Sequence, residues 1–147
     1  MRVNFLRLEV FINLYNNFVI LRRFVASKNS PSAIIPKGTI TFDQKPIDNT
    51  NSFDAATGHF KAPVQGSYVF FVNAWVRQNT QSEIVVYVNG DSVKYFGDYN
   101  TVGDYRQLNF FLAYELQKDD EVWLKNNYAD SIYASIYHPT TFLGYLM

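Results

Sequence analysis

Acidic and amide side chains gather in one glycine-containing stretch of this chain. Asp98 and Asp104 lie at its two ends, Tyr99 and Asn100 follow the first of them, and Gln107 comes just beyond the second. Carboxylate, amide and backbone carbonyl oxygens are the ligands that calcium takes in proteins. The composition of this stretch therefore allows a calcium site. The alternative is an ordinary solvated polar loop.

The two histidines give no comparable indication of catalysis. His59 lies in a segment with strand character, and His138 lies in a loop before Pro139. Neither is spaced with a carboxylate as metal-binding motifs require, and the sequence has no nucleophile-elbow, phosphate-loop or zinc motif. Without a catalytic constellation in the sequence, we expect a protein that is not an enzyme.

A second set of polar and aromatic residues falls in expected loops, where a rigid sheet scaffold commonly displays its binding groups. Exposed tyrosine, asparagine and arginine suit adaptable recognition of sugars or protein surfaces. The candidate ligand-binding residues are Arg77, Asn79, Asn100, Arg106, Asn127, Tyr128 and His138.

Composition favours a single packed β domain. The chain has 147 residues, of which 48% are hydrophobic and 18% aromatic, and this favours a packed core over disorder. Aromatic residues are enriched in strands. The formal net charge is zero, so neither nucleic acid nor an anionic membrane is an expected partner. The absence of cysteine excludes disulfides and cysteine-based zinc sites.

The N-terminal segment, residues 1–23, differs from the rest of the chain. Charged and amide residues interrupt its apolar stretches, and no window approaches about 18 uninterrupted apolar residues, so we expect no membrane span. Apolar residues recur at helical spacing between Leu8 and Val19. Three interpretations stay open: a short amphipathic helix or stalk, a degenerate signal segment without a clear cleavage site, and an extra strand or irregular arm.

From residue 24 to 147, strand patterns follow one another with no helical pattern between them. This arrangement is typical of an all-β sandwich or jelly roll. Asn89-Gly90 predicts a tight hairpin, since both residues tolerate positive φ, and Pro46 to Ser52 reads as turn. The expected strands are 39–42, 59–62, 67–77, 84–88, 92–96, 108–116, 121–124, 132–137 and 141–147.

Two of these strands are apolar on both faces. In 67–77 and in 108–116, aromatic and aliphatic residues occupy even and odd positions alike. A strand of a sheet with one solvated face should instead alternate apolar with polar residues. One face can fill the interior of the sandwich, and the other needs cover as well. A partner subunit is the natural candidate, and loops or the first 23 residues are the alternative.

Several motifs together resemble the globular head of complement component C1q and its relatives. Residues 53–70 carry the pattern best, and they are followed by Asp120-Glu121-Val122-Trp123-Leu124 and by a terminal Phe-Leu-Gly-Tyr-Leu. Asp119 departs from the glycine that the family prefers there, and Leu143 replaces a small polar residue. The fixed positions matched in the first motif are Phe53, Thr57, Gly58, Phe60, Ala62, Pro63, Gly66, Tyr68 and Phe70.

The resemblance implies a domain over residues 24–147 with a ten-strand jelly roll shared with tumour necrosis factor relatives. It also implies secretion and a homotrimer. The sequence contains no Gly-x-y run, so we expect a member without a collagen stalk. The implied function is recognition of glycan or protein ligands, in an innate-immune or lectin-like role. A trimeric cytokine-like signalling ligand and a structural trimerisation module stay as alternatives.

The same resemblance bears on individual residues. Some relatives bind calcium through an Asp-Tyr pair and a nearby Gln, and Asp98-Tyr99 with Gln107 looks similar, although Asp104-Tyr105 competes for the role. Calcium is therefore the one cofactor to test. The residues expected at the trimer interface or in the core are Phe71, Trp75, Phe111, Phe142 and Tyr145.

Overall fold

A computed structural model describes residues 22–29 and 33–147 of the chain. Within these ranges the protein is built from strands, and none of the described segments forms a helix that could cross a bilayer. The three interpretations of the N-terminal segment concern residues that lie almost wholly outside the described ones. The strands are β1 (Arg23–Lys28), β2 (Ala33–Ile35), β3 (Gly38–Thr39), β4 (Gln44–Asp48), β5 (Phe53–Asp54), β6 (His59–Lys61), β7 (Gly66–Val76), β8 (Ser82–Val88), β9 (Asp91–Asp98), β10 (Arg106–Leu116), β11 (Glu121–Asn126), β12 (Ile132–Ala134) and β13 (Thr140–Leu146).

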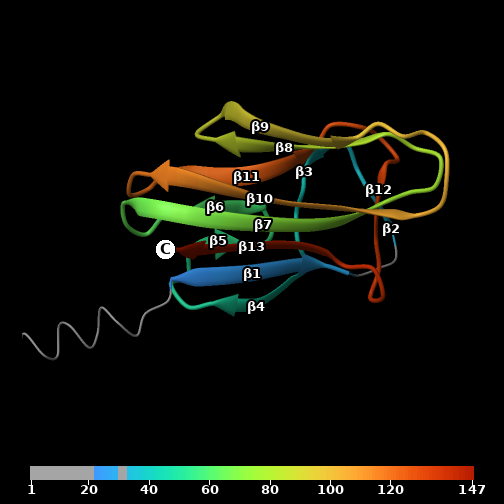
Figure 1. Cartoon of the computed structure of the whole chain (residues 1–147). Helices are drawn as coiled ribbons and strands as arrows, with labels where there is room; N and C mark the ends of the chain where they lie inside the picture. Colours follow the sequence, from blue (N-terminus) through green and yellow to red (C-terminus); the bar gives the residue numbers. More distant parts are fainter. Residues whose placement is uncertain (1–21, 30–32) are drawn as a thin grey trace, which may run out of the picture.

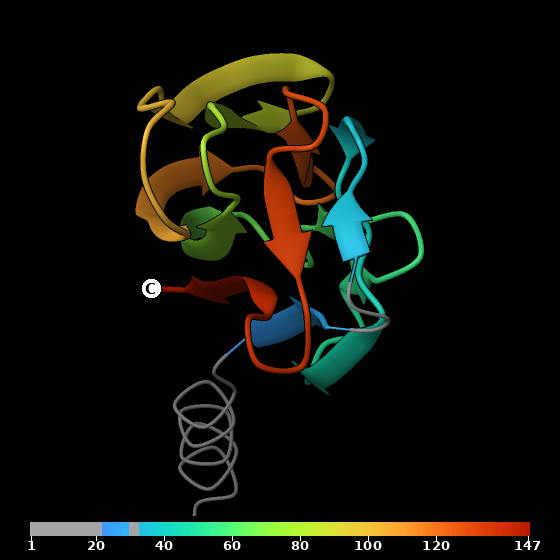
Figure 2. The same ribbon diagram turned by 90° about the vertical axis from the view of Figure 1, so that its right-hand side faces the viewer.

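The strands form two antiparallel sheets. The larger sheet has the order β2-β12-β7-β13-β1-β4, and β10 pairs with β7 as well. The smaller sheet has the order β5-β6-β11-β8-β9, with β3 on β11. Figure 1 shows β7, β13 and β1 running side by side, and Figure 2 turns the end that carries β2 and β12 toward the reader. This is the expected all-β jelly-roll sandwich.

An aromatic core joins the sheets. Phe24 of β1 stacks on Phe53 of β5 with ring centroids 4.5 Å apart, and Phe142 meets the Phe24 ring edge-on at 5.0 Å. All three side chains are at most 2% exposed. Burying a phenylalanine contributes roughly 1.5–3 kcal/mol, and aromatic pairs add to this, so this cluster stabilises the contact between the layers.

Two glycines occupy positions where a side chain would force neighbouring atoms to move. Gly58 has φ +76°, and a Cβ atom there would lie 2.0 Å from the carbonyl oxygen of Ile40. A Cβ on Gly144 of β13 would lie 2.6 Å from Cε1 of Phe24 and 2.8 Å from the Phe70 ring. The close packing of β13 against the aromatic core therefore depends on a residue without a side chain.

The strongest strand predictions are confirmed. β7 and β10 lie within one or two residues of their expected bounds, and Asn89 and Gly90 turn between β8 and β9 with φ values of 51° and 94°. β1 begins at Arg23, one residue before the expected start of the domain.

Other predictions about the strands are wrong. The turn expected from Pro46 is instead part of β4, which lies at the edge of the larger sheet. An edge strand tolerates proline, because a residue on its unpaired side does not need to donate a backbone N–H to the ladder. The strand expected over 39–42 ends at Thr39, and the one expected over 132–137 ends at Ala134. β2 and β5, which are three and two residues long, were not predicted from the sequence.

Candidate functional site

The outer face of the larger sheet presents a second set of side chains, opposite the core. Phe70, Val72 and Ala74 of β7 point inward and are at most 3% exposed, so the residues between them point outward. Cross-strand register arranges the outward residues of β10, β7 and β13 in layers. Along β7 the layers are Val69 with Ala113 and Tyr145, Phe71 with Phe111 and Leu143, Asn73 with Asn109 and Thr141, and Trp75 with Gln107 and Tyr133.

The most exposed apolar layer is that of the two phenylalanines. Phe111 is 66% exposed and Phe71 is 40% exposed, with their ring centroids 5.9 Å apart. Tyr145 stacks on Phe71 at 6.4 Å. A groove of about 370 Å³ lies beside these rings, and Leu143 is part of its lining. Full burial of a phenylalanine side chain contributes roughly 1.5–3 kcal/mol, and these exposed rings do not gain all of it in a single copy. Contact with another surface would therefore be favourable on this face.

The flank next to this face is open. Among the described strands, β9 pairs only with β8 and β10 only with β7, so both sheets end on this side as far as the structure describes them. Phe96 of β9 stacks on Phe110 of β10 with centroids 3.6 Å apart. Leu108, Phe110 and Leu112 pack against the core but stay only partly buried. They are partly buried because no described strand closes the sandwich here. We call β9, β10 and these side chains the open edge.

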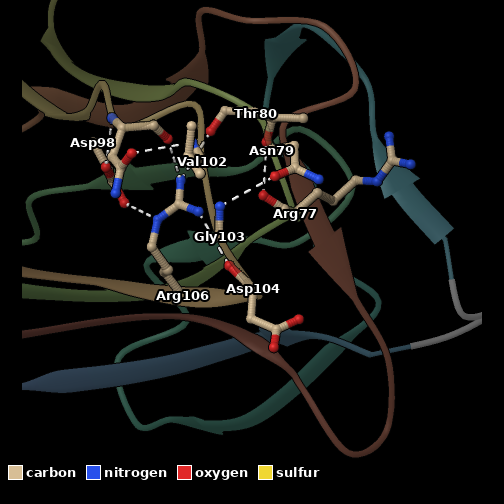
Figure 3. Close-up of polar contacts among 9 residues, drawn as sticks. Arg77, Asn79, Thr80, Asp98, Val102, Gly103, Asp104 and Arg106 are labelled. Carbon is tan, nitrogen blue, oxygen red and sulfur yellow. Dashed lines mark hydrogen bonds and ion pairs between the residues drawn. The ribbon is translucent and has the colours of Figure 1, made fainter.

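At one end of the sandwich, Arg106 ties two loops together (Figure 3). Its Nε donates to Asp98 Oδ2 at 2.6 Å, and its two terminal nitrogens donate to three backbone carbonyls. These carbonyls belong to Thr80 at 2.9 Å, Asn100 at 2.7 Å and Asp104 at 3.1 Å. The Arg106 hydrogen bond is the main cause that holds the pKa of Asp98 below its ordinary value, with a further bond from the Asn100 amide.

The four expected calcium ligands do not fit a calcium site in this geometry. The Asp98 carboxylate binds Arg106 and the Asn100 amide, while Asp104 Oδ1 accepts from Gln78 Nε2 at 2.6 Å. The hydroxyl of Tyr99 donates to Glu83, which raises the pKa of that tyrosine, and Gln107 lies on the outer face of β10. Among residues 22–29 and 33–147, no three acidic or histidine side chains are grouped as a metal ion would need. A guanidinium therefore occupies the position next to Asp98 where a cation was expected.

The structure brings some of the candidate ligand-binding residues together. Asn100 belongs to the Arg106 network because its carbonyl accepts from Arg106. Asn79 joins the same loop, since its Oδ1 accepts from the Gly103 amide at 3.1 Å. Arg77 lies beside it and donates to the carbonyl of Asp130 at 2.9 Å. These residues form a single ordered surface at the loop end of the sandwich.

Asn127 and Tyr128 lie at the same end of the sandwich, in the loop after β11 that Arg77 contacts, whereas His138 lies against the outer face of the larger sheet. Asn127 donates to Glu83 at 2.6 Å, and its neighbour Tyr128 lies in the turn after β11. His138 meets the Trp75 ring edge-on at 4.5 Å, so it belongs with the outer face of the larger sheet. Of the residues expected at the trimer interface or in the core, Phe71, Trp75, Phe111 and Tyr145 share this outer face, whereas Phe142 is buried inside the sandwich.

The smaller sheet also carries an aromatic stack that was not predicted from the sequence. His59, Trp123 and Tyr87 lie nearly parallel, with centroids 4.3 Å and 5.7 Å apart, and His59 Nδ1 is 3.3 Å from Glu121 Oε2. A hollow of about 840 Å³ lies next to it, and Lys61 is part of its lining. The stack depends on the register that places Trp123 opposite Tyr87, and sequence alone does not give that register.

Comparison with known proteins agrees with this architecture. A family model described as C1q domain matches residues 23–147. Complement C1q tumor necrosis factor-related protein 5 of Homo sapiens is 31% identical over 135 residues, which are 86% of this chain and 54% of that protein. Complement C1q tumor necrosis factor-related protein 3 of Mus musculus is 32% identical over 110 residues, covering 74% of this chain and 44% of that protein. This chain thus spans about half the length of these relatives.

Solved structures show the same fold. The globular domain of zebrafish complement 1qA superposes with a TM-score of 0.71 at 23% identity and covers 86% of this chain and 97% of its own. Eiger TNF from S. frugiperda superposes with a TM-score of 0.69 at 11% identity, covering 86% and 93%. The match of the family model to residues 23–147 shows that this chain belongs to the C1q domain family.

Proposed function

We propose that this protein is a secreted, non-enzymatic recognition protein that assembles as a homotrimer and binds glycan or protein ligands at the loop end of its sandwich. The observation that carries the proposal is the presence of two different apolar surfaces side by side. One is the outer face around Phe71 and Phe111, and the other is the open edge around Phe110.

Two unlike surfaces suit a ring of copies. A twofold dimer buries the same patch on both subunits, whereas a head-to-tail contact pairs one patch with another and closes into a ring when the rotation permits. In such a ring, the open edge of one copy covers the outer face of the next. Both long unpaired edge strands are then protected, which also removes a template for aggregation.

The loop end is the proposed ligand surface. The Arg106 network fixes the connections between β7 and β8 and between β9 and β10, so their exposed side chains are held in place before a ligand arrives. Tyr105 is 45% exposed and Val102 is 73% exposed on this surface. A preordered surface of aromatic, amide and guanidinium groups loses little entropy on binding. The names of the similar relatives, complement C1q tumor necrosis factor-related proteins, are consistent with an extracellular role.

Sedimentation of the full chain tests the assembly. We expect a species of three times the chain mass, and we expect Phe111→Glu to shift it to a monomer, because a carboxylate would be buried at the covered face. Thr39→Glu is the control, since Thr39 is exposed on β3 of the smaller sheet and lies outside both the outer face and the open edge. A wild-type monomer at micromolar concentration, or equal dissociation of the two variants, would overturn the proposed trimer.

Ligand binding is tested on the assembled protein with an array of glycans and with extracts of cell-surface proteins. We expect binding that Arg77→Ala weakens while the assembly stays intact. A single high-affinity cell-surface receptor would instead identify a cytokine-like ligand. An assembled protein without any partner would overturn the recognition role and leave a trimerisation module.

A further inference from the structure

One layer of the outer face is polar and lies between two other layers. The layer that contains Phe71 is apolar, and the layer that contains Trp75 is largely aromatic. Asn73 of β7 lies opposite Asn109 of β10 and opposite Thr141 of β13. The neighbouring layers contain Phe71 on one side and Trp75 on the other. A face that only needed to be hidden from water would have no reason to place amides between its aromatic rows.

The amides of this layer are aligned with one another. Asn73 Nδ2 donates to Asn109 Oδ1, and Asn109 Nδ2 lies 3.4 Å from Gln107 Oε1. A primary amide has two donors and an acceptor with two lone pairs. Within the described part of the chain, each of these amides makes fewer hydrogen bonds than it can, so the row has capacity for a partner.

The layer also borders the groove on this face. The groove of about 370 Å³ is lined mostly by apolar atoms and spans the layer of Phe71, Phe111 and Leu143 and the layer of Asn73, Asn109 and Thr141. A neighbouring surface that fills the groove with apolar groups must also give hydrogen-bonding groups to the amides that border it. The wrong match leaves buried amides unpaired, which is costly.

We propose that the Asn73–Asn109–Thr141 layer fixes the register in which copies of this chain assemble and restricts which related chains can join them. The inference rests on the proposed trimer and goes one step beyond it. Side chains on one face of a strand recur every two residues, about 6.8 Å apart, so a copy displaced by one layer would place apolar side chains on the amides. A buried asparagine selects register and partner in coiled coils by the same physical rule, at a cost in stability.

The first test replaces both amides with leucine. We expect Asn73→Leu/Asn109→Leu to keep the sandwich but lose selectivity, so that the variant populates more than one assembled species. The foreign probe is the globular domain of zebrafish complement 1qA, refolded together with each protein and identified by native mass spectrometry. We expect the wild type to form self-assemblies only and the variant to form mixed ones. Thr39→Leu on the smaller sheet is the matched control, and we expect it to behave as the wild type.

A second variant avoids dependence on a new apolar surface. Asn109→Asp preserves shape but brings like charges to one level of the assembly once the carboxyls ionise. We expect its dissociation constant to rise at least about 30-fold at neutral pH and to recover near pH 4, because an unpaired buried charge is strongly disfavoured. Circular dichroism at both pH values checks that the strands are intact.

The outcomes separate the inference from the proposed trimer. A monomeric wild type overturns both. A wild type that assembles but accepts the zebrafish domain overturns the selectivity. The role of the polar layer alone is overturned by a combination of three results. The wild type is a trimer, the leucine variant forms a single assembled species that excludes the zebrafish domain, and the aspartate variant assembles as well as the wild type at neutral pH.

Discussion

Replacing Arg106 with alanine removes the cation that ties the β7–β8 loop to the β9–β10 loop. The side chains of Arg106 and Asp98 are 20% and 24% exposed, so their pair is only partly screened by water. The variant loses one ion pair at 2.6 Å and three hydrogen bonds to backbone carbonyls. Bonds to charged groups contribute about 1.5–3 kcal/mol each but are not additive, and partial exposure lowers them, so we expect a total loss of about 3 kcal/mol.

Thermal unfolding at fixed protein concentration measures this loss. A change of about 3 kcal/mol corresponds to a fall in Tm of roughly 6–12 °C for a domain of this size. Arg106→Lys keeps the charge but cannot reach four acceptors with a planar fork, so we expect an intermediate fall. Arg77→Ala is the control, because the one hydrogen bond described for this guanidinium goes to the Asp130 carbonyl. A Tm for Arg106→Ala equal to that of the control would refute the reasoning.

The same variant has a defined pH signature. The pKa of Asp98 is lowered in the folded protein, so its contribution is fully present above the ordinary aspartate pKa and is lost as the pH falls through the lowered folded value. We therefore expect the Tm difference between wild type and Arg106→Ala to shrink below about pH 4.

Calcium at 100 times its dissociation constant would add about 2.7 kcal/mol to the stability of a protein that binds it. We expect no such shift with calcium or with a chelator, because Arg106 already holds the Asp98 carboxylate.

Three further substitutions test the packing, each by urea unfolding of the purified chain. Gly144→Ala should cost about 1–3 kcal/mol, because the new Cβ would lie 2.6 Å from the Phe24 ring, and an unchanged midpoint would contradict the close approach of β13. Asn126→Leu should cost about 2–4 kcal/mol, since its buried Nδ2 donates to the Ile35 carbonyl at 3.1 Å and its Oδ1 accepts from Ser131 at 3.1 Å; a neutral effect would show that these groups find other partners. Phe142→Ala should cost about 3–5 kcal/mol, and a loss below 1 kcal/mol would place that ring outside the core.

The sequence predicted those parts of the fold in which a local pattern is long enough to be unambiguous. β7 and β10 are eleven residues each and carry apolar residues on both faces, and the Asn89-Gly90 turn has a specific backbone requirement. β2 and β5 are three and two residues long, which is too short for any periodicity. β4 contains Pro46, and its strand character comes from pairing with β1 rather than from its own residues.

The candidate calcium site stays a prediction, and its residues were grouped by a different kind of signal. Proximity in sequence grouped Asp98 with Gln107, but successive residues of a strand point to opposite sides, so Arg106 and Gln107 at the start of β10 cannot both face Asp98. The sequence predicts Arg106 only as a ligand-binding residue, although it is the first basic side chain after Asp98. Weighing each carboxylate against the cations already present in the same segment would have predicted the ion pair.

The order of the layers along the strands suggests how assembly and recognition share one small domain. The apolar layers with Val69 and Phe71 lie farthest from the loop end, the amides of Asn73 follow, and Trp75 comes last before the Arg106 network. A neighbouring copy seated on the apolar layers and positioned by the amides would leave the loops beyond Trp75 uncovered. Three sets of loops would then project from the same end, and a ligand that contacts more than one copy would gain affinity through effective concentration rather than through tighter individual contacts.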